Sequence, residues 1–373
     1  MDIEERFKLI TRNLEEVLTP GDLKKLLEKE VPLKHYIGFE ISGKLHLGSA
    51  ILSMMKVRDY QKAGVDTSVF LADWHTWINN KLEGKKENIN KAAKYFEEVF
   101  KISLKTVGGD PEKLRILKGS ELYHNNDKYW ETVIDVAKHT TLSRMMRSIT
   151  IAGRKEGESV NFALLIYPAM QVADIFTQGI NLAHSGIDQR KAHVVAREVA
   201  LSLETSPLIH EGEKYKPIAL HHPLLPGLKL PPGKNPKEMT KEELSALKMS
   251  KSIPGSAIFV TDTREEVEKA VMNAYCPAKD TSYNPVLTWA KLLIFNEDKL
   301  LEVKRPEKYG GDKTYESYDQ LEEDFVNGSL HPLDLKKAVA EYINDLLEPI
   351  REHFSKGRAR ELKEFMDSLT VTR

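Results

Sequence analysis

The segment His35-Tyr36-Ile37-Gly38-Phe39-Glu40-Ile41-Ser42-Gly43-Lys44-Leu45-His46-Leu47-Gly48-Ser49 carries the clearest fold signal in this chain. Its first residues are rich in β-branched and aromatic side chains, which favours a strand. Gly43 and Gly48 follow, and a helical pattern then runs from about 50 to 63. We therefore expect a strand, a loop and a helix, the unit from which parallel sheets are built.

The same alternation continues after this unit. Further strands are predicted at 66–73, 114–117, 180–185 and 217–221, and helices at 87–107, 161–177 and 188–203. Because strand and helix alternate from residue 33 to about 222, βαβ units are expected. The predicted fold class is α/β, a Rossmann-like parallel sheet with helices on both faces.

Both ends of the chain have a helical pattern. Apolar residues at helical spacing predict one helix over 4–18, which Thr19-Pro20-Gly21 ends, with Asp22 as the cap of the next helix. Beyond about residue 263 the pattern is mostly helical, at 264–275, 284–296 and 333–354.

This change of pattern predicts two domains. The first covers 1–262, with a connective insertion at about 121–160 and a mobile loop at about 223–262. The second is a mostly helical C-terminal domain at 263–373.

Composition limits the class of protein. The 373 residues include 55 basic and 56 acidic side chains, a net charge of −1, so any RNA contact must come from local basic patches. The longest apolar stretch, 162–170, is far shorter than the ~20 residues that span a bilayer, and a signal peptide is not recognisable. The single cysteine, Cys276, excludes a disulfide framework and a multi-cysteine zinc site. We expect a cytoplasmic protein with no membrane partner.

The motif His46-Leu47-Gly48-Ser49 opens the helix of the first unit. A helix N-terminus offers free N–H groups to a triphosphate, and an imidazole there can stabilise charge that develops on the α-phosphate. Gly48 lets a nucleotide approach the backbone closely. Alone the motif is weak evidence for triphosphate binding, because a loop histidine before a helix explains it equally well.

The motif Lys248-Met249-Ser250-Lys251-Ser252 follows a loop rich in proline and glycine. Two lysines around small hydroxylated residues can form a mobile cationic arm, which neutralises a pyrophosphate leaving group when it closes. The alternative interpretation is a solvated basic loop.

Together, the two motifs resemble the two signatures of class I aminoacyl-tRNA synthetases. Three longer segments resemble the archaeal and eukaryotic type of tyrosyl-tRNA synthetase, and these are 36–48, 167–175 and 188–193. The chain departs from the family pattern at Ser49, where histidine is usual, and at Ile41, where proline is usual. The second signature is complete, including Lys251, where archaeal relatives often carry serine.

The segment 167–175 carries the candidate tyrosine-binding residues. Tyr167, Gln171 and Asp174 are spaced i, i+4, i+7 and therefore lie on one helix face. Asp174 is the best acceptor for a phenol hydroxyl, and the resemblance implies that Tyr36 makes the second hydrogen bond. Gln189 is expected to join Tyr167 and Gln171 around the α-ammonium. The alternative is a polar face turned to solvent, but apolar neighbours favour burial.

The resemblance implies ATP as a substrate, with Mg²⁺ and no dedicated metal-ligand set. It assigns catalysis to His46, Lys248 and Lys251, and ATP binding to Gly38, His46, Gly48, Ser49, Lys248, Ser250 and Lys251. Asp73 and His75, after the second strand, lie where ligands bind in open α/β sheets, but we interpret His75 as structural.

The resemblance also implies tRNA contacts. Arg147, Arg190 and Lys191 match residues that meet the acceptor stem. Tyr309, His331 and Asp334 match the anticodon-reading loops, which makes 263–373 an anticodon-binding domain and 1–262 the catalytic one. A homodimer through the segment around 121–155 is implied as well.

The expected function is activation of L-tyrosine with ATP to tyrosyl-adenylate, followed by transfer of tyrosine to the 3′ end of tyrosine tRNA, with AMP and pyrophosphate released. Three alternatives remain open from the sequence: a tryptophanyl enzyme of the same fold, a non-catalytic RNA-binding paralogue and a small nucleotidyltransferase.

Overall fold

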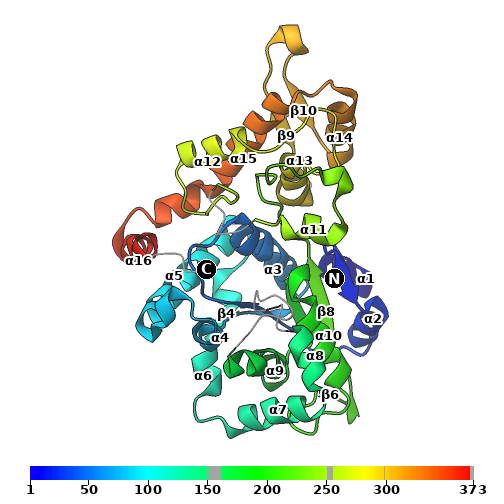
Figure 1. Ribbon diagram of the computed structural model, residues 1–373. Coiled ribbons are helices and arrows are strands. Elements are labelled where there is room, and N and C mark those ends of the chain that lie inside the picture. Colours follow the sequence, from blue (N-terminus) through cyan, green and yellow to red (C-terminus); the bar gives the residue numbers. More distant parts are fainter. Residues whose placement is uncertain (149–150, 152–160, 250–254, 298, 370–373) are drawn as a thin grey trace.

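A six-stranded, mostly parallel sheet forms the centre of the molecule (Figure 1). The computed structural model describes residues 1–148, 151, 161–249, 255–297 and 299–369. The strand order is β1-β8-β5-β2-β3-β4, and only β1 runs antiparallel to its neighbour. The strands are β1 (Glu16–Leu18), β2 (Lys34–Phe39), β3 (Asp66–Leu71), β4 (Leu114–Lys118), β5 (Leu182–Gly186) and β8 (Ile218–His222). The prediction of a parallel α/β sheet is confirmed.

Helices cover both faces of this sheet, as predicted. One face packs on α1 (Ile3–Thr11), α2 (Pro20–Glu28), α3 (Ser53–Lys62) and α5 (Lys86–Thr106). The other face packs on α7 (Asp127–Lys138), α9 (Phe162–Thr177) and α10 (Arg190–Val199). The strands are therefore buried on both sides, which explains their apolar sequences.

The prediction of one helix over 4–18 is wrong. Helix α1 ends at Thr11, and Asn13 adopts a positive φ of 58° that turns the chain. Residues Glu16–Leu18 then pair with β8 as an antiparallel edge strand. Backbone pairing to an open sheet edge has overridden the helical spacing of the apolar residues. The cap of α2 is Thr19, whose side chain accepts from the Asp22 backbone N–H at 3.2 Å, and Asp22 lies in the first turn.

The predicted second strand is two residues shorter than expected. It ends at Leu71, and Asp73 begins α4 (Asp73–Ile78). The Asp73 carboxylate accepts from the backbone N–H groups of Trp74 and Ser120, both at 2.9 Å. These bonds tie the start of α4 to α6 (Gly119–Tyr123). The predicted insertion contains α6, α7 and α8 (Leu142–Ser148), and most of its remainder lies outside the described residues.

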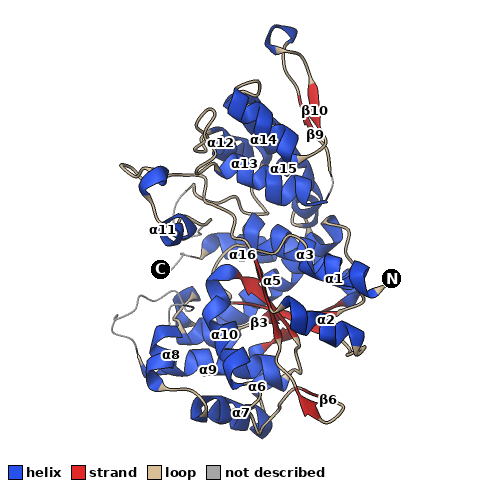
Figure 2. Ribbon diagram, turned by 90° about the vertical axis from the view of Figure 1, so that its right-hand side faces the viewer, coloured by secondary structure: helices blue, strands red, loops and turns tan. Residues whose placement is uncertain are grey.

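The C-terminal part is mostly helical, as predicted (Figure 2). Its helices are α12 (Arg264–Met272), α13 (Pro285–Trp289), α14 (Tyr318–Asn327), α15 (Pro332–His353) and α16 (Gly357–Ser368). A hairpin of β9 (Leu301–Val303) and β10 (Lys313–Tyr315) projects from them, and a smaller hairpin, β6 (Ile209–His210) and β7 (Glu213–Lys214), lies at the opposite end. The short helix α11 (Lys241–Ala246) lies in the predicted loop.

One hydrophobic core joins the sheet to these helices. Buried residues of α3 and α5 and of α12, α13, α15 and α16 form a single continuous cluster. The rings of Tyr95 in α5 and Phe354 at the end of α15 lie 5.4 Å apart, and His353 Nε2 lies 2.9 Å from Glu98 Oε2. The C-terminal helices are therefore packed against α5. No helix in the described ranges is long and apolar enough to cross a membrane.

Candidate active site

A cavity of about 280 Å³ opens at the carboxyl ends of β2, β5 and β8. In open parallel sheets this edge is where ligands bind. The predicted residues that line it are Tyr36, Gly38, His46, Gly48, Ser49, Tyr167, Gln171, Asp174, Gln189 and Lys248. They come from segments more than two hundred residues apart, which the fold brings to one place. Ser250 and Lys251 lie outside the described residues.

Asp174 lies at the buried end of this cavity. It is 2% exposed, and Oδ1 accepts a hydrogen bond from the Tyr123 hydroxyl at 3.0 Å. Burial raises the pKa of Asp174 well above its ordinary value, against the opposing effect of the phenols of Tyr123 and Tyr129. The buried carboxyl can therefore pair with a hydroxyl group that enters the cavity.

His75 forms part of the wall beside Asp174. Its Nε2 lies 4.0 Å from Asp174 Oδ2, too far for a hydrogen bond, and its ring meets the Tyr167 ring edge-on at 4.3 Å. Both ring nitrogens are buried and have no partner among the residues that the structure describes. Burial lowers the pKa of His75 to about 4, so the ring is neutral at pH 7. His75 therefore lies at the ligand-binding edge of the sheet, where the sequence placed it.

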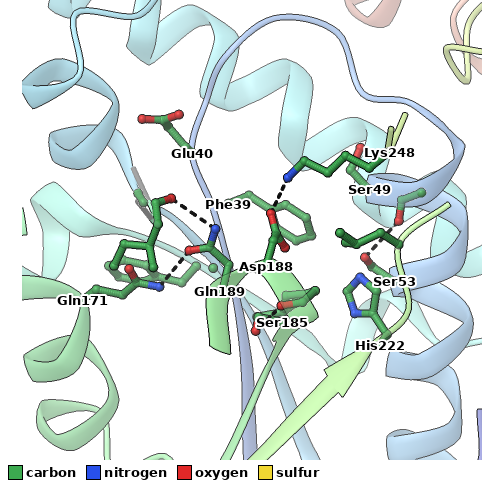
Figure 3. Close-up of a pocket in the computed structure, with 18 of the residues that line it drawn as sticks. Phe39, Glu40, Ser49, Ser53, Gln171, Ser185, Asp188, Gln189, His222 and Lys248 are labelled. Carbon is green, nitrogen blue, oxygen red and sulfur yellow. Dashed lines mark hydrogen bonds and ion pairs between the residues drawn. The ribbon is translucent and has the colours of Figure 1, made fainter. Parts of the chain in front are cut away.

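Two glutamines line a further part of the cavity wall (Figure 3). Gln171 Nε2 donates to Gln189 Oε1 at 3.4 Å, and Gln189 Nε2 donates to the Ile151 carbonyl at 3.2 Å. Gln171 Oε1 is buried without a partner in the described part of the chain. Glu40 lies on the same side of the cavity, where its Oε1 accepts from Asn79 Nδ2 at 2.8 Å. This concentration of acceptors suits a ligand ammonium group.

The histidine motif is held together by local hydrogen bonds. The Ser49 backbone N–H donates to His46 Nδ1 at 3.3 Å, and Ser49 Oγ donates to the His46 carbonyl at 3.1 Å. A Cβ at Gly48 would lie only 3.3 Å from two atoms of the His46 ring. Glycine at position 48 therefore also makes room for the imidazole, and the Ser49 hydroxyl is engaged with the backbone.

Lys248 reaches into the same half of the cavity. Its Nζ lies 2.5 Å from Asp188 Oδ2, in the ion pair drawn in Figure 3. The side chains are 41% and 32% exposed, so the pair is open to solvent and to competing anions. Asp188 therefore holds the Lys248 cation at the wall of the cavity.

The predicted acceptor-stem residues lie outside the cavity. The Lys191 ammonium donates to the Arg147 carbonyl at 3.3 Å, which brings α8 and α10 together. Arg190 Nε lies 2.8 Å from Glu16 Oε2, and the same carboxylate oxygen lies 2.8 Å from His221 Nδ1. The structure thus groups Arg147 with Lys191 and binds Arg190 to the edge strand β1.

The predicted anticodon residues lie on the C-terminal helices and their loops. Tyr309 is 62% exposed, with Lys308 Nζ 4.8 Å from its ring centroid. His331 caps α15, where Nδ1 accepts from the Leu333 backbone N–H at 3.1 Å. Asp334 lies in the first turn of the same helix and is half-buried. None of the three lines the cavity.

A family model described as tRNA synthetases class I (W and Y) matches residues 28–348. A protein from Thermococcus sibiricus named tyrosine–tRNA ligase is 55% identical over 379 residues, covering 100% of both chains. The chain belongs to the archaeal-type tyrosyl-tRNA synthetases of class I. A second tyrosine–tRNA ligase, from Pyrococcus furiosus, is 54% identical and also covers 100% of both chains.

Solved tyrosyl-tRNA synthetases have the same fold. The Pyrococcus horikoshii enzyme, solved with L-tyrosine, matches with a TM-score of 0.95 and 53% identity, over 99% of this chain and 100% of that one. The Aeropyrum pernix enzyme matches with a TM-score of 0.82 and 38% identity, over 99% of both chains. The α/β sheet and the C-terminal helices are therefore those of tyrosyl-tRNA synthetases.

Sequence reasoning missed Asp188 and His222, which line the cavity of this tyrosyl-tRNA synthetase, and Tyr123, which contacts Asp174. Tyr123 comes from α6, in a segment with mixed patterning, and no sequence signal indicated its contact with Asp174. Asp188 directly precedes Gln189, and a carboxylate beside a predicted binding residue is a usable signal. His222 directly follows the strand predicted at 217–221, at the same edge of the sheet as Asp73, so its position alone could have identified it.

Proposed function

We propose that this tyrosine–tRNA ligase binds the tyrosine phenol at Asp174 and the ATP phosphates near His46 and Lys248. The observation that carries the proposal is one cavity with a buried carboxyl at one end and a helix start with a histidine and a lysine at the other. Tyrosyl-adenylate and pyrophosphate form there, and tyrosine then passes to the 3′ end of tyrosine tRNA.

Recognition of tyrosine follows from the cost of unpaired polar groups. Asp174, in α9, is buried against Tyr123 of α6, and Tyr36 lies 2% exposed in the same cavity. A phenylalanine ring would leave the Asp174 carboxyl without the hydroxyl it is placed to meet, which costs free energy. At the other end, Tyr167, Gln171 and Gln189 offer oxygen atoms to the α-ammonium.

Catalysis needs no protein nucleophile. The tyrosine carboxylate attacks the α-phosphate in line, and the His46 imidazole stabilises the charge that develops there. Lys248 exchanges Asp188 for the departing pyrophosphate, and Lys251 is assigned the same task from the sequence motif. Within the described residues no group of three carboxylate, histidine or cysteine ligands could hold a metal. Mg²⁺ is therefore proposed to enter with ATP, held by phosphate oxygens and water.

Amino-acid-dependent ATP–pyrophosphate exchange tests this function. We expect exchange with tyrosine and background rates with tryptophan and phenylalanine. Exchange with tryptophan alone would identify the tryptophanyl alternative, and no exchange with any amino acid would identify the silent paralogue. The relatives named tyrosine–tRNA ligase favour tyrosine, and the intact lysine motif argues against the silent paralogue.

The tRNA-binding residues are proposals. Arg147, Arg190 and Lys191 are assigned to the acceptor stem because they lie on α8 and α10 near the cavity. Tyr309, His331 and Asp334 are assigned to the anticodon, since an exposed tyrosine can stack on an unpaired base. The division into a catalytic domain at 1–262 and an anticodon-binding domain at 263–373 belongs to this proposal, as does a cytoplasmic location.

A homodimer is proposed through α7, α8 and the start of α9. Ile134, Leu142 and Phe162 are 62%, 68% and 76% exposed on these three helices, which pack together. Exposed large apolar side chains on neighbouring helices are typical of an interface. Phe162→Glu should shift the molecular mass in analytical ultracentrifugation from dimer to monomer, whereas Leu300→Glu, at an exposed leucine elsewhere, should not. A wild-type monomer contradicts the proposal.

A further inference from the structure

Three buried histidines on neighbouring strands connect the cavity to the interior of the sheet. His222 Nδ1 lies 2.8 Å from His184 Nε2, and His184 Nδ1 lies 3.1 Å from His35 Nε2. His35 and His184 are 0% exposed and His222 is 7% exposed. Of the three, only His222 lines the cavity. We call them the histidine chain.

The sheet register explains why the three rings meet. His35 in β2 is paired with Leu182 in β5, and His184 lies two residues further along that strand. His184 is paired in turn with Leu220 in β8, and His222 again lies two residues further along. Because side chains two residues apart share a face, the three imidazoles form one diagonal row. The row advances toward the carboxyl ends of the strands and reaches the cavity there.

All three rings are neutral at pH 7. Burial lowers the pKa of His35 to about 3 and that of His222 to about 4, and it lowers the pKa of His184 in the same direction. A neutral imidazole donates from one nitrogen and accepts at the other. The tautomers of the chain are therefore linked, and only two arrangements keep both hydrogen bonds.

The two arrangements differ at the buried end of the chain. His35 Nδ1 is buried and has no partner among the described residues. It must carry either an unpaired N–H or an unpaired lone pair, and buried N–H groups without a partner are the rarer of the two. This preference places the His35 proton on Nε2, from which it donates to His184.

The cavity end favours the same arrangement. A Cβ at Gly186 would lie 2.6 Å from Asp188 Oδ1 and 3.6 Å from His222 Nε2, so both atoms face the gap that this glycine leaves open. A protonated Nε2 would face a carboxylate favourably, whereas a lone pair would face it unfavourably. Figure 3 shows His222 and Asp188 on the side of the cavity away from Gln171.

We propose that the histidine chain fixes His222 as an N–H donor, through Nε2, to an acceptor atom of the nucleotide. His222 is then a nucleotide-binding residue, and His184 and His35 are positioning residues that act through it. The proposal rests on the assignment of this half of the cavity to ATP. The His222 N–H adds a hydrogen-bond donor to this half of the cavity. The motif His46-Leu47-Gly48-Ser49 lacks one at Ser49, because the Ser49 hydroxyl is engaged with the His46 carbonyl.

Nitrogen-15 NMR of histidine-labelled full-length protein tests the tautomer directly. In the wild type we expect a protonated Nε2 and an unprotonated Nδ1 on His222. An unprotonated Nε2 overturns the proposal. This measurement needs neither substrate nor activity, so it separates a failure of the histidine chain from a failure of the proposed function.

His184→Leu breaks the chain without changing a cavity residue. We expect the KM for ATP in tyrosine-dependent exchange to rise about tenfold, the loss of one hydrogen bond, with the KM for tyrosine unchanged. His184→Gln, whose amide can accept from His35 and donate to His222, should restore both the KM for ATP and the His222 tautomer. It also provides a test if His184→Leu does not fold.

A second pair of buried histidines supplies the control. His193 Nδ1 lies 3.1 Å from His221 Nε2, and both rings are buried but neither lines the cavity. His193→Leu should leave the KM for ATP unchanged. Equal effects of His184→Leu and His193→Leu on that KM, or no effect of His184→Leu, would overturn the proposal.

Discussion

At the scale of the residue, Asp174 is a carboxyl whose place suits binding and not stability. The raised pKa of Asp174 means that ionising it inside the fold is unfavourable, because burial removes water from the carboxylate. Its side chain accepts a hydrogen bond from Tyr123. A carboxyl whose ionisation destabilises the fold and which faces a cavity is typical of a binding site.

The raised pKa predicts how Asp174→Asn changes stability with pH. Below the ordinary carboxyl pKa, about 4, both folded and unfolded states are protonated and the residue costs nothing. As pH rises further, the unfolded chain ionises first, and the free energy of unfolding falls until the folded pKa is passed. Asparagine does not titrate, so Asp174→Asn should be more stable than the wild type at pH 8 by about 1–3 kcal/mol.

Denaturant unfolding of both proteins at pH 4 and pH 8 measures this difference. The stability advantage of Asp174→Asn should grow between the two pH values, while its KM for tyrosine at pH 8 should rise. A variant that is less stable than the wild type at pH 8 would show that Asp174 is ionised and well paired in the empty fold.

The sequence identified many cavity residues because they occur in contiguous segments with recognisable spacing, such as Tyr167 and Asp174 on one helix. It did not identify Tyr123 or His222, because their roles depend on contacts between separate elements. The orphaned nitrogens of His75 were equally invisible, since an unpaired atom is a property of the packed structure and not of the residue type.

At the scale of the element, the loop that carries Lys248 is proposed to act in one step, the departure of pyrophosphate. The Lys248 ammonium is paired with Asp188. The pair is partly exposed, so its net contribution to stability is small, about 0–1 kcal/mol. Exchange of this partner for a phosphate group therefore costs little.

Lys248→Ala should reduce tyrosine-dependent pyrophosphate exchange by about 10²–10³-fold in kcat, the usual loss for one charge-stabilising group. The KM for tyrosine should remain unchanged, because Lys248 lies in the half of the cavity that we propose for the nucleotide. Lys234→Ala is a matched control, a 52% exposed lysine of the same loop that does not line the cavity. Similar rates for the two variants would remove Lys248 from the catalytic step.

The elements themselves were predicted unevenly. The parallel strands were located to within about two residues because they are short apolar runs bounded by glycine and proline. Strand β1 was mistaken for helix because Leu14 and Leu18 match a helical period, and its pairing with β8 depends on residues two hundred positions away. Helices α14 and α16 were missed because their patterns are short and rich in charge.

At the scale of the whole molecule, the continuous core predicts that the sheet and the C-terminal helices unfold together. Phe354 is 3% exposed and packs on Tyr95, which links α15 to α5. Phe354→Ala should lower the free energy of unfolding by about 3–5 kcal/mol, the usual cost of deleting a buried phenylalanine. Leu300→Ala, at a leucine that is 55% exposed, should change it little.

Tryptophan fluorescence can follow both parts of the chain. Trp130 lies beside the sheet in α7, whereas Trp289 is buried in α13. Single-tryptophan variants at these two positions should show coincident transitions. Two separate transitions would show that the C-terminal helices fold as an independent unit in spite of the shared core.

We propose that Asp174 identifies tyrosine by its hydroxyl group. The most direct test compares kcat/KM for tyrosine and phenylalanine in pyrophosphate exchange by the wild type and Asp174→Ala. Wild-type preference for tyrosine is expected near ~10⁵, a value that comes from tyrosyl-tRNA synthetases themselves and not from this structure. In Asp174→Ala the preference should largely disappear, because kcat/KM for tyrosine should fall. A preference that survives this substitution unchanged would contradict the account.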